Sequence, residues 1–152
     1  INKTIGDLAG PMAFAIHMGS SRAFYGKFGD KINLERFMQY SAVLCMVSYL
    51  MIAFIPVPAL GILGCAVCGL SVGIMWPGTF SMAAASVKRG GTALFALLAL
   101  AGDVGCSSGP TYVGMISGAL NDNLKLGIFA ALIFPVLMIM GIKMIGSLQK
   151  YD

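Results

Sequence analysis

Charged residues are scarce in this sequence of 152 residues, where Lys, Arg, Asp and Glu together make up only 11%. Soluble domains carry about 25% of such residues. Hydrophobic residues account for 58% of the chain, another 20 residues are glycine, and the mean hydropathy is +0.86. A soluble globule of this size would leave too much of this apolar material in water. The composition therefore argues against a soluble enzyme, a nucleic-acid binder and a disordered chain, and it predicts a polytopic membrane protein.

The sequence also lacks the signatures of known catalytic sites. It contains no Gly-x-Ser-x-Gly nucleophile elbow, no P-loop and no dinucleotide-binding fingerprint. An intramembrane aspartyl protease needs two membrane aspartates, whereas Asp103 is the single acidic residue in the middle of an apolar run. The four cysteines, including Cys65 and Cys68, also lie in apolar runs, where a thiol behaves as a small hydrophobe. We therefore expect no enzyme activity, no metal and no cofactor.

Long apolar runs separated by short gaps predict an all-α fold, a polytopic bundle of about five membrane-spanning helices. A helix needs about 20 apolar residues to cross a bilayer, and the alternating pattern of barrel strands is missing. We expect Pro56 and Pro58 to end the second helix, Pro77 to kink the third, and Pro110 and Pro135 to lie inside the last two. The predicted helices of this single transmembrane domain cover about residues 8–24, 37–55, 60–87, 92–120 and 126–148.

The basic residues predict the orientation of these helices. Only Lys3 and Lys125 lie on one side, and the other eight lie in the gaps and the tail of the opposite side. Basic residues favour the cytoplasmic side, so the C-terminus is expected in the cytoplasm and the N-terminus of this chain outside. The expected location is a bacterial inner membrane or a plasma membrane. The eight residues on the cytoplasmic side are Arg22, Lys27, Lys31, Arg36, Lys88, Arg89, Lys143 and Lys150.

Glycine pairs at a spacing of four predict close contacts between helices. Gly69 and Gly73 form such a pair in the third run, and Gly105 and Gly109 form one in the fourth. Gly102 extends the second pair along one helix face. We therefore expect the fourth helix to be buried against its neighbours, either in ordinary packing or in a sliding contact.

Three polar or aromatic residues inside the apolar runs are candidates for a substrate cavity or a coupling site. Asp103 is costly in a membrane, so it is expected to face water, pair with a cation or stay protonated; the alternative is a structural hydrogen bond between helices. His17 is of the residue type that suits a proton relay, although it also suits simple packing. Trp76 precedes Pro77, where its indole suits stacking on a sugar or an apolar ligand, with an interfacial belt position as the alternative.

The gap after the first run resembles a loop signature of the major facilitator superfamily. The matching residues are Gly26, Asp30 and Lys31, in the order Gly-x-x-x-Asp-Lys, with Arg22 at the edge of the gap. In that family the signature joins the second and third helices of each six-helix half. The Gly-Arg-Arg/Lys that follows in the family is absent here, as is common in the second half.

Two further helices are similar to fucose-permease-like sugar transporters of that family. The stretch around Gly73 to Phe80 looks like their tenth helix, and the stretch around Gly105 to Gly118 looks like their eleventh. The resemblance makes the five helices the eighth to the twelfth of a twelve-helix transporter. The chain is then part of a C-terminal half, and the N-terminal half of the same transporter is its missing partner.

The resemblance implies alternating access around a site at the membrane midplane. Asp30 and Lys31 would lock a cytoplasmic gate together with Arg22, and Gly26 would permit a tight turn. The alternative is a solvated loop that only sets topology. The expected function is secondary active transport of a small solute, a sugar or related metabolite, with proton coupling implied by the family. The competing hypothesis is a non-transporting membrane module, or a truncated fragment, that assembles with another chain.

An antibody against residues 143–152 would measure the size of the native protein in its source membrane. Because the resemblance makes this chain the second part of a twelve-helix transporter, we expect a species of about three times its 15.9 kDa. A species at 15.9 kDa would support the assembling module instead.

Overall fold

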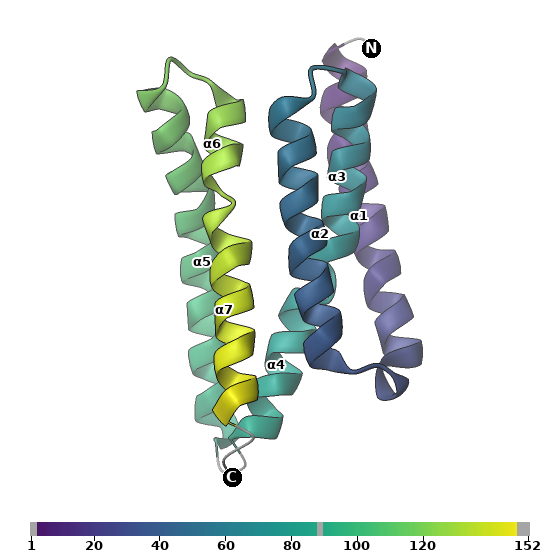
Figure 1. The fold of residues 1–152 in the computed structure, drawn as a ribbon, viewed down its shortest axis with the longest axis vertical. Coiled ribbons are helices and arrows are strands. Elements are labelled where there is room, and N and C mark those ends of the chain that lie inside the picture. Colours follow the sequence, from purple (N-terminus) through teal and green to yellow (C-terminus); the bar gives the residue numbers. More distant parts are fainter. Residues whose placement is uncertain (1–2, 88–89, 149–152) are drawn as a thin grey trace.

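A computed structural model describes residues 3–87 and 90–148, which form helices joined by short turns (Figure 1). No strand occurs within these two ranges, so the predicted all-α class is confirmed. The α-helices are α1 (Lys3–Phe28), α2 (Leu34–Phe54), α3 (Pro58–Val72), α4 (Met75–Ser86), α5 (Gly91–Ala119), α6 (Leu124–Ala130) and α7 (Ile133–Leu148), and a 3₁₀ turn, η1 (Gly29–Lys31), follows α1.

Four stretches are long and apolar enough to cross a membrane: Leu34–Phe54, Pro58–Ser86, Gly91–Ala119 and Leu124–Ser147. The chain is thus an integral membrane protein, as its composition predicted. Helix α1 has 26 residues but is not among the four. Polar residues such as His17 and Arg22 interrupt its apolar sequence, and its crossing of the membrane stays a prediction.

The third predicted helix bends where Pro77 was expected to disturb it. Helix α3 ends at Val72 and α4 begins at Met75, with a turn at residues 73–74 between them. Pro77 has no N–H to donate to the carbonyl of Gly73, one turn earlier. The side chain of Arg22 in α1 donates from Nε to this Gly73 carbonyl at 3.3 Å. The break therefore lies at the carbonyl that the proline leaves free, and a neighbouring helix satisfies it.

The last predicted helix is also divided, which corrects the expectation of one continuous helix over residues 126–148. Helix α6 ends at Ala130 and α7 begins at Ile133, although the whole stretch keeps the length of one span. Pro135 lies in the first turn of α7 and cannot donate to the carbonyl of Ala131. Helix α5, by contrast, continues through Pro110 without a break.

Helix α2 lies at the centre of the arrangement (Figure 1). On one side it packs against α3, which in turn packs against α1, and on the other side it contacts α6 and α7. Helix α5 lies at the edge, where it contacts α6 and α4. The buried apolar cluster of Met38, Met82 and Ile142 joins α2, α4 and α7. The bundle is therefore well packed around α2 and open along α5.

The predicted contact through Gly69 and Gly73 is confirmed, and its partner is α1. A Cβ atom on Gly69 would lie on the backbone of Phe14, 2.9 Å from its Cα. A Cβ on Gly73 would lie 2.8 Å from the Cβ of Ser21. Only glycine allows the two backbones to approach this closely.

The expected burial of the fourth predicted helix is wrong for the part of the chain that the structure describes. Ser117 is the one buried residue of α5. A Cβ atom on Gly105, Gly109, Gly114 or Gly118 would meet nothing within 4 Å. The reason is the position of α5 at the edge of the bundle, where its contacts with α4 and α6 occupy only one of its faces.

A methyl group added at Gly69 tests the seam between α1 and α3. We expect Gly69→Ala to destabilise the folded protein by ~1–3 kcal/mol, because the backbones of the two helices must separate. Gly61→Ala is the matched control, since Gly61 lies in α3 with nothing within 4 Å of its added Cβ. Thermal unfolding in detergent micelles measures both variants, and equal midpoints would contradict the proposed close contact.

Candidate functional site

Trp76 sits directly after the α3–α4 break, against the glycine of a neighbouring helix. A Cβ atom on Gly102 of α5 would overlap Cη2 and Cζ3 of the indole. The Phe80 ring lies 4.7 Å from the Trp76 ring between centroids, and Phe80 stacks in turn on Phe95 at 5.7 Å. Trp76 is thus held between a glycine and a row of aromatic rings, while 45% of its surface remains exposed.

The exposed part of Trp76 lines a cavity of about 460 Å³ between α2, α4, α5 and α7. Tyr49, Phe80 and Phe134 supply further aromatic walls. The Thr79 hydroxyl in this cavity donates to its own helix, to the carbonyl of Met75 at 2.7 Å. Such walls favour the apolar face of a small ligand, because aromatic rings offer area and few polar groups.

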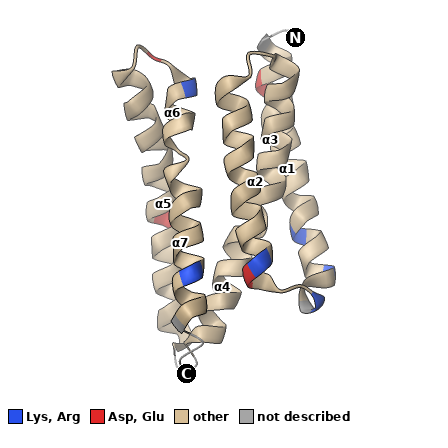
Figure 2. Cartoon of the chain, in the orientation of Figure 1, with Lys and Arg blue, Asp and Glu red and all other residues tan. Residues whose placement is uncertain are grey.

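Asp103 lies next to Gly102 on α5 but on a different face. Figure 2 shows a red position in the middle of α5, whose sequence contains Asp103 as its one acidic residue. Ser107 and Thr111 follow at one-turn intervals, and all three line a shallow, open hollow along the outer face of α5. The Ser107 hydroxyl donates to the carbonyl of Asp103 at 3.0 Å, and that of Thr111 to the carbonyl of Ser107 at 2.8 Å. Their oxygens remain free to accept hydrogen bonds from a ligand.

Because Trp76 contacts Gly102, the residue before Asp103, the structure places Trp76 and Asp103 at the same level of the bundle. It does not place them in one cavity, because the indole faces the space between helices and Asp103 lines the outer face of α5. Tyr112 connects the two regions, since it lines the Asp103 hollow and its ring packs edge-on against Phe134 at 5.7 Å.

His17 lies apart from both cavities. It is exposed on α1, and its Nδ1 lies 2.8 Å from the Ala13 carbonyl of the same helix. Helix α1 packs against α3, whereas Asp103 belongs to α5 on the other side of α2. A role of His17 in coupling stays a prediction.

The residues of the expected gate loop are spread over α1 and η1. Arg22 is one of them, and its guanidinium reaches the α3–α4 break rather than the loop. Gly26 lies in the last turns of α1 with helical backbone, so the tight turn is formed at Gly29–Lys31 and not at Gly26. Lys31 is exposed at the end of η1, and the side chain of Asp30 lies outside the described residues.

Sequence reasoning missed two elements of this site. The sequence contains a signal for the hydrogen bond from Arg22 to Gly73, because Pro77 leaves the carbonyl four residues before it without its usual donor. The sequence contains no signal for the aromatic walls formed by Tyr49 and Phe134, because these residues come together only through the packing of α2 and α7. No known protein family, curated protein or solved structure matches this chain.

The fluorescence of Trp76 can report its contact with Gly102, because the chain contains a single tryptophan. We expect Gly102→Ala to lower the fluorescence anisotropy of Trp76, since the added methyl group displaces the ring from α5. Gly105→Ala is the control on the same helix, with nothing within 4 Å of its added Cβ. Identical anisotropy in both variants would show that α5 does not hold the indole.

Proposed function

We propose that this chain is part of a secondary transporter that moves a small polar solute across the membrane by alternating access. The observation that supports this proposal is the open polar face of α5. This face carries Asp103, Ser107 and Thr111 along a helix of membrane-spanning length. In the described part of the chain, the side chains of all three are exposed. A carboxylate facing lipid is costly, so this face requires either a water-filled pathway or a partner.

The roles of the residues in this proposal follow from their chemistry. The Asp103 carboxylate accepts hydrogen bonds from solute hydroxyls and carries the coupled proton, and the hydroxyls of Ser107 and Thr111 extend the polar track. Trp76 stacks on the apolar face of a sugar or related metabolite. The breaks before α4 and before α7 are typical of transporter helices that line a pathway.

The likeness to the major facilitator superfamily extends the proposal to the whole protein. An N-terminal half would then cover the open face of α5 and complete the site between the halves. Arg22, Gly26, Asp30 and Lys31 would belong to the cytoplasmic gate, with the C-terminus in the cytoplasm. Supporting this orientation is the gathering of basic residues in the gap after α1 and in the C-terminal tail.

A second candidate function is a membrane module that assembles with another chain without transporting a solute. The open glycines of α5 favour it, because Gly105, Gly109, Gly114 and Gly118 offer an unfilled surface for a further helix. In that assembly Asp103 forms a hydrogen bond between helices.

Uptake by cells that express the complete natural gene product tests the transport proposal. With a panel of labelled sugars and related metabolites, we expect Asp103→Asn to lower uptake of the transported solute by at least about tenfold, as for loss of a charged hydrogen-bond partner. Asp122→Asn is the matched control, because it removes the same charge from the α5–α6 turn. Membrane abundance is measured alongside. If cells expressing the protein take up none of the solutes faster than vector-only cells do, the transport proposal is contradicted.

Thiol labelling distinguishes the two candidates. In a background in which the natural cysteines are replaced, a membrane-impermeant maleimide is expected to label Ser107→Cys but not Leu137→Cys, an exposed apolar position of α7. Labelling of neither position, together with cross-linking of Ser107→Cys to a second polypeptide, would favour the assembling module.

A further inference from the structure

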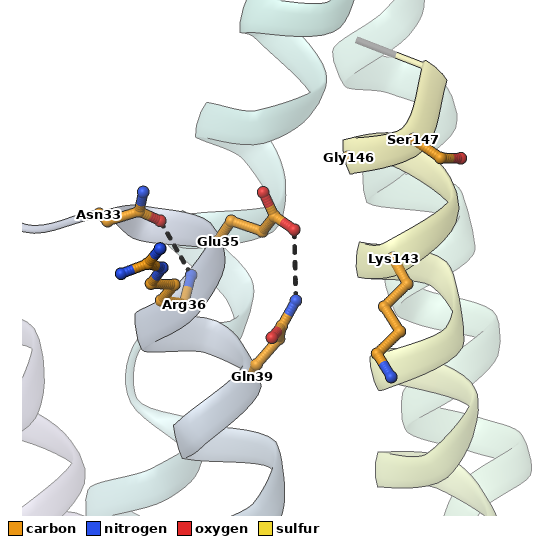
Figure 3. Close-up of a pocket in the computed structure, with 7 residues that line it drawn as sticks. All are labelled: Asn33, Glu35, Arg36, Gln39, Lys143, Gly146 and Ser147. Atoms are coloured by element: carbon orange, nitrogen blue, oxygen red, sulfur yellow. Dashed lines mark hydrogen bonds between the residues drawn. The ribbon is translucent and has the colours of Figure 1, made fainter. Parts of the chain in front are cut away.

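A groove separates the beginning of α2 from the end of α7 (Figure 3). Its volume is about 720 Å³. It is independent of the Trp76 cavity and of the Asp103 hollow, with which it shares no lining residue. The groove is lined by Asn33, Glu35, Arg36, Gln39, Lys143, Gly146 and Ser147.

The carboxylate of Glu35 forms one wall of the groove. Its Oε1 accepts a hydrogen bond from Nε2 of Gln39 at 3.3 Å, so its partner there is a neutral amide. On α7 a Cβ atom at Gly146 would lie 2.7 Å from the same Oε1. The missing side chain at Gly146 thus allows the carboxylate to rest against the backbone of α7, where it keeps lone pairs available for a cation.

The ammonium group of Lys143 lies on the facing wall at a different depth. Figure 3 shows the Lys143 side chain running along α7 away from Ser147, so that its nitrogen is nearer the level of Gln39 than that of Glu35. Side chains of a helix lean toward its N-terminus, which explains this direction. From the helix ends inward, the groove therefore presents first a negative and then a positive group. Arg36 lies on the Asn33 side of α2 in the same view.

The groove lies at the ends of two stretches that are long and apolar enough to cross a membrane. One membrane-spanning stretch begins at Leu34 and another ends at Ser147. Further inward, exposed apolar residues follow on the same two helices. Val43 and Val47 follow Gln39 at one-turn intervals on α2, and Met140 and Val136 precede Lys143 on α7.

We propose that this groove binds the headgroup of a phospholipid that carries a primary ammonium, of the phosphoethanolamine type. In such a lipid the phosphate is next to the acyl chains and the ammonium lies farther out, which is the order of Lys143 and Glu35. Lys143 pairs with the phosphate, and the ammonium donates a hydrogen bond to Glu35. The acyl chains lie over the exposed valines and Met140. An anionic headgroup lacks a partner for Glu35, and a choline headgroup has no N–H to donate.

Lipid retention by the purified, full-length natural protein tests this assignment. Native mass spectrometry follows the protein in detergent with equal amounts of phosphatidylethanolamine, phosphatidylcholine and phosphatidylglycerol of the same acyl chains. We expect phosphatidylethanolamine to be retained about tenfold more than phosphatidylcholine, the effect of one charge-assisted hydrogen bond. Glu35→Gln is expected to abolish this preference, because the amide no longer attracts the ammonium. Lys143→Gln is expected to weaken retention of all three lipids.

Matched variants separate these changes in lipid retention from the effects of misfolding and of altered net charge. Asp122→Asn and Lys125→Gln make the same charge changes at the opposite end of the bundle and are expected to leave the preference unchanged. Lys143→Arg keeps the positive charge and should retain the lipid. Equal retention of phosphatidylethanolamine and phosphatidylcholine, a preference for phosphatidylglycerol, or an unaltered preference in Glu35→Gln would overturn the proposal. So would displacement of the lipid by soluble phosphoethanolamine at micromolar concentration, which would identify a soluble ligand.

Discussion

Backbone groups in a membrane have no water to bind, so a carbonyl that a proline leaves free at a helix break needs another donor. Pro77 and Pro135 each deprive the carbonyl four residues earlier of its usual donor. At Gly73 the missing donor is replaced by the Arg22 side chain of α1. Arg22 can reach this carbonyl because the glycines of the α3 seam bring the two helices close together. The helix break at Gly73, the glycine seam between α1 and α3, and Arg22 thus form one structural unit.

The part of the molecule around this unit is densely packed, whereas the part along α5 is open. Helices α1, α2 and α3 pack through small residues, whereas α5 lies at the edge, where it contacts α4 and α6 and touches α7 through Tyr112 and Phe134. The open face of α5 is also the face that carries Asp103, where a membrane tolerates polarity least. Transport and assembly with another chain are two ways to give this face a polar or protein environment. The groove at Glu35 and Lys143 is a separate polar feature, at the ends of two stretches of membrane-spanning length.

Part of the candidate site could be predicted from the sequence, since single residues carry strong local signals. Asp103 stands out as a charge inside an apolar run, and Trp76 beside a proline marks a helix break. The position of Trp76 against Gly102 could not be predicted, because it depends on the packing of α4 against α5. Burial of α5 was predicted wrongly for a related reason. Glycine spacing indicates that a helix can pack closely, but it does not identify the partner.

The sequence by itself determined the class of this protein. Sparse charge and long apolar runs leave membrane helices as the structure that satisfies the backbone, and Pro77 marks one helix break, although α5 continues through Pro110. Only the tertiary structure decided which surfaces meet. It placed α1 in the Gly69–Gly73 seam, left α5 at the edge, and brought Glu35 and Lys143 to opposite walls of one groove. Such contacts join residues far apart in the chain, and their geometry follows from packing rather than from local sequence pattern.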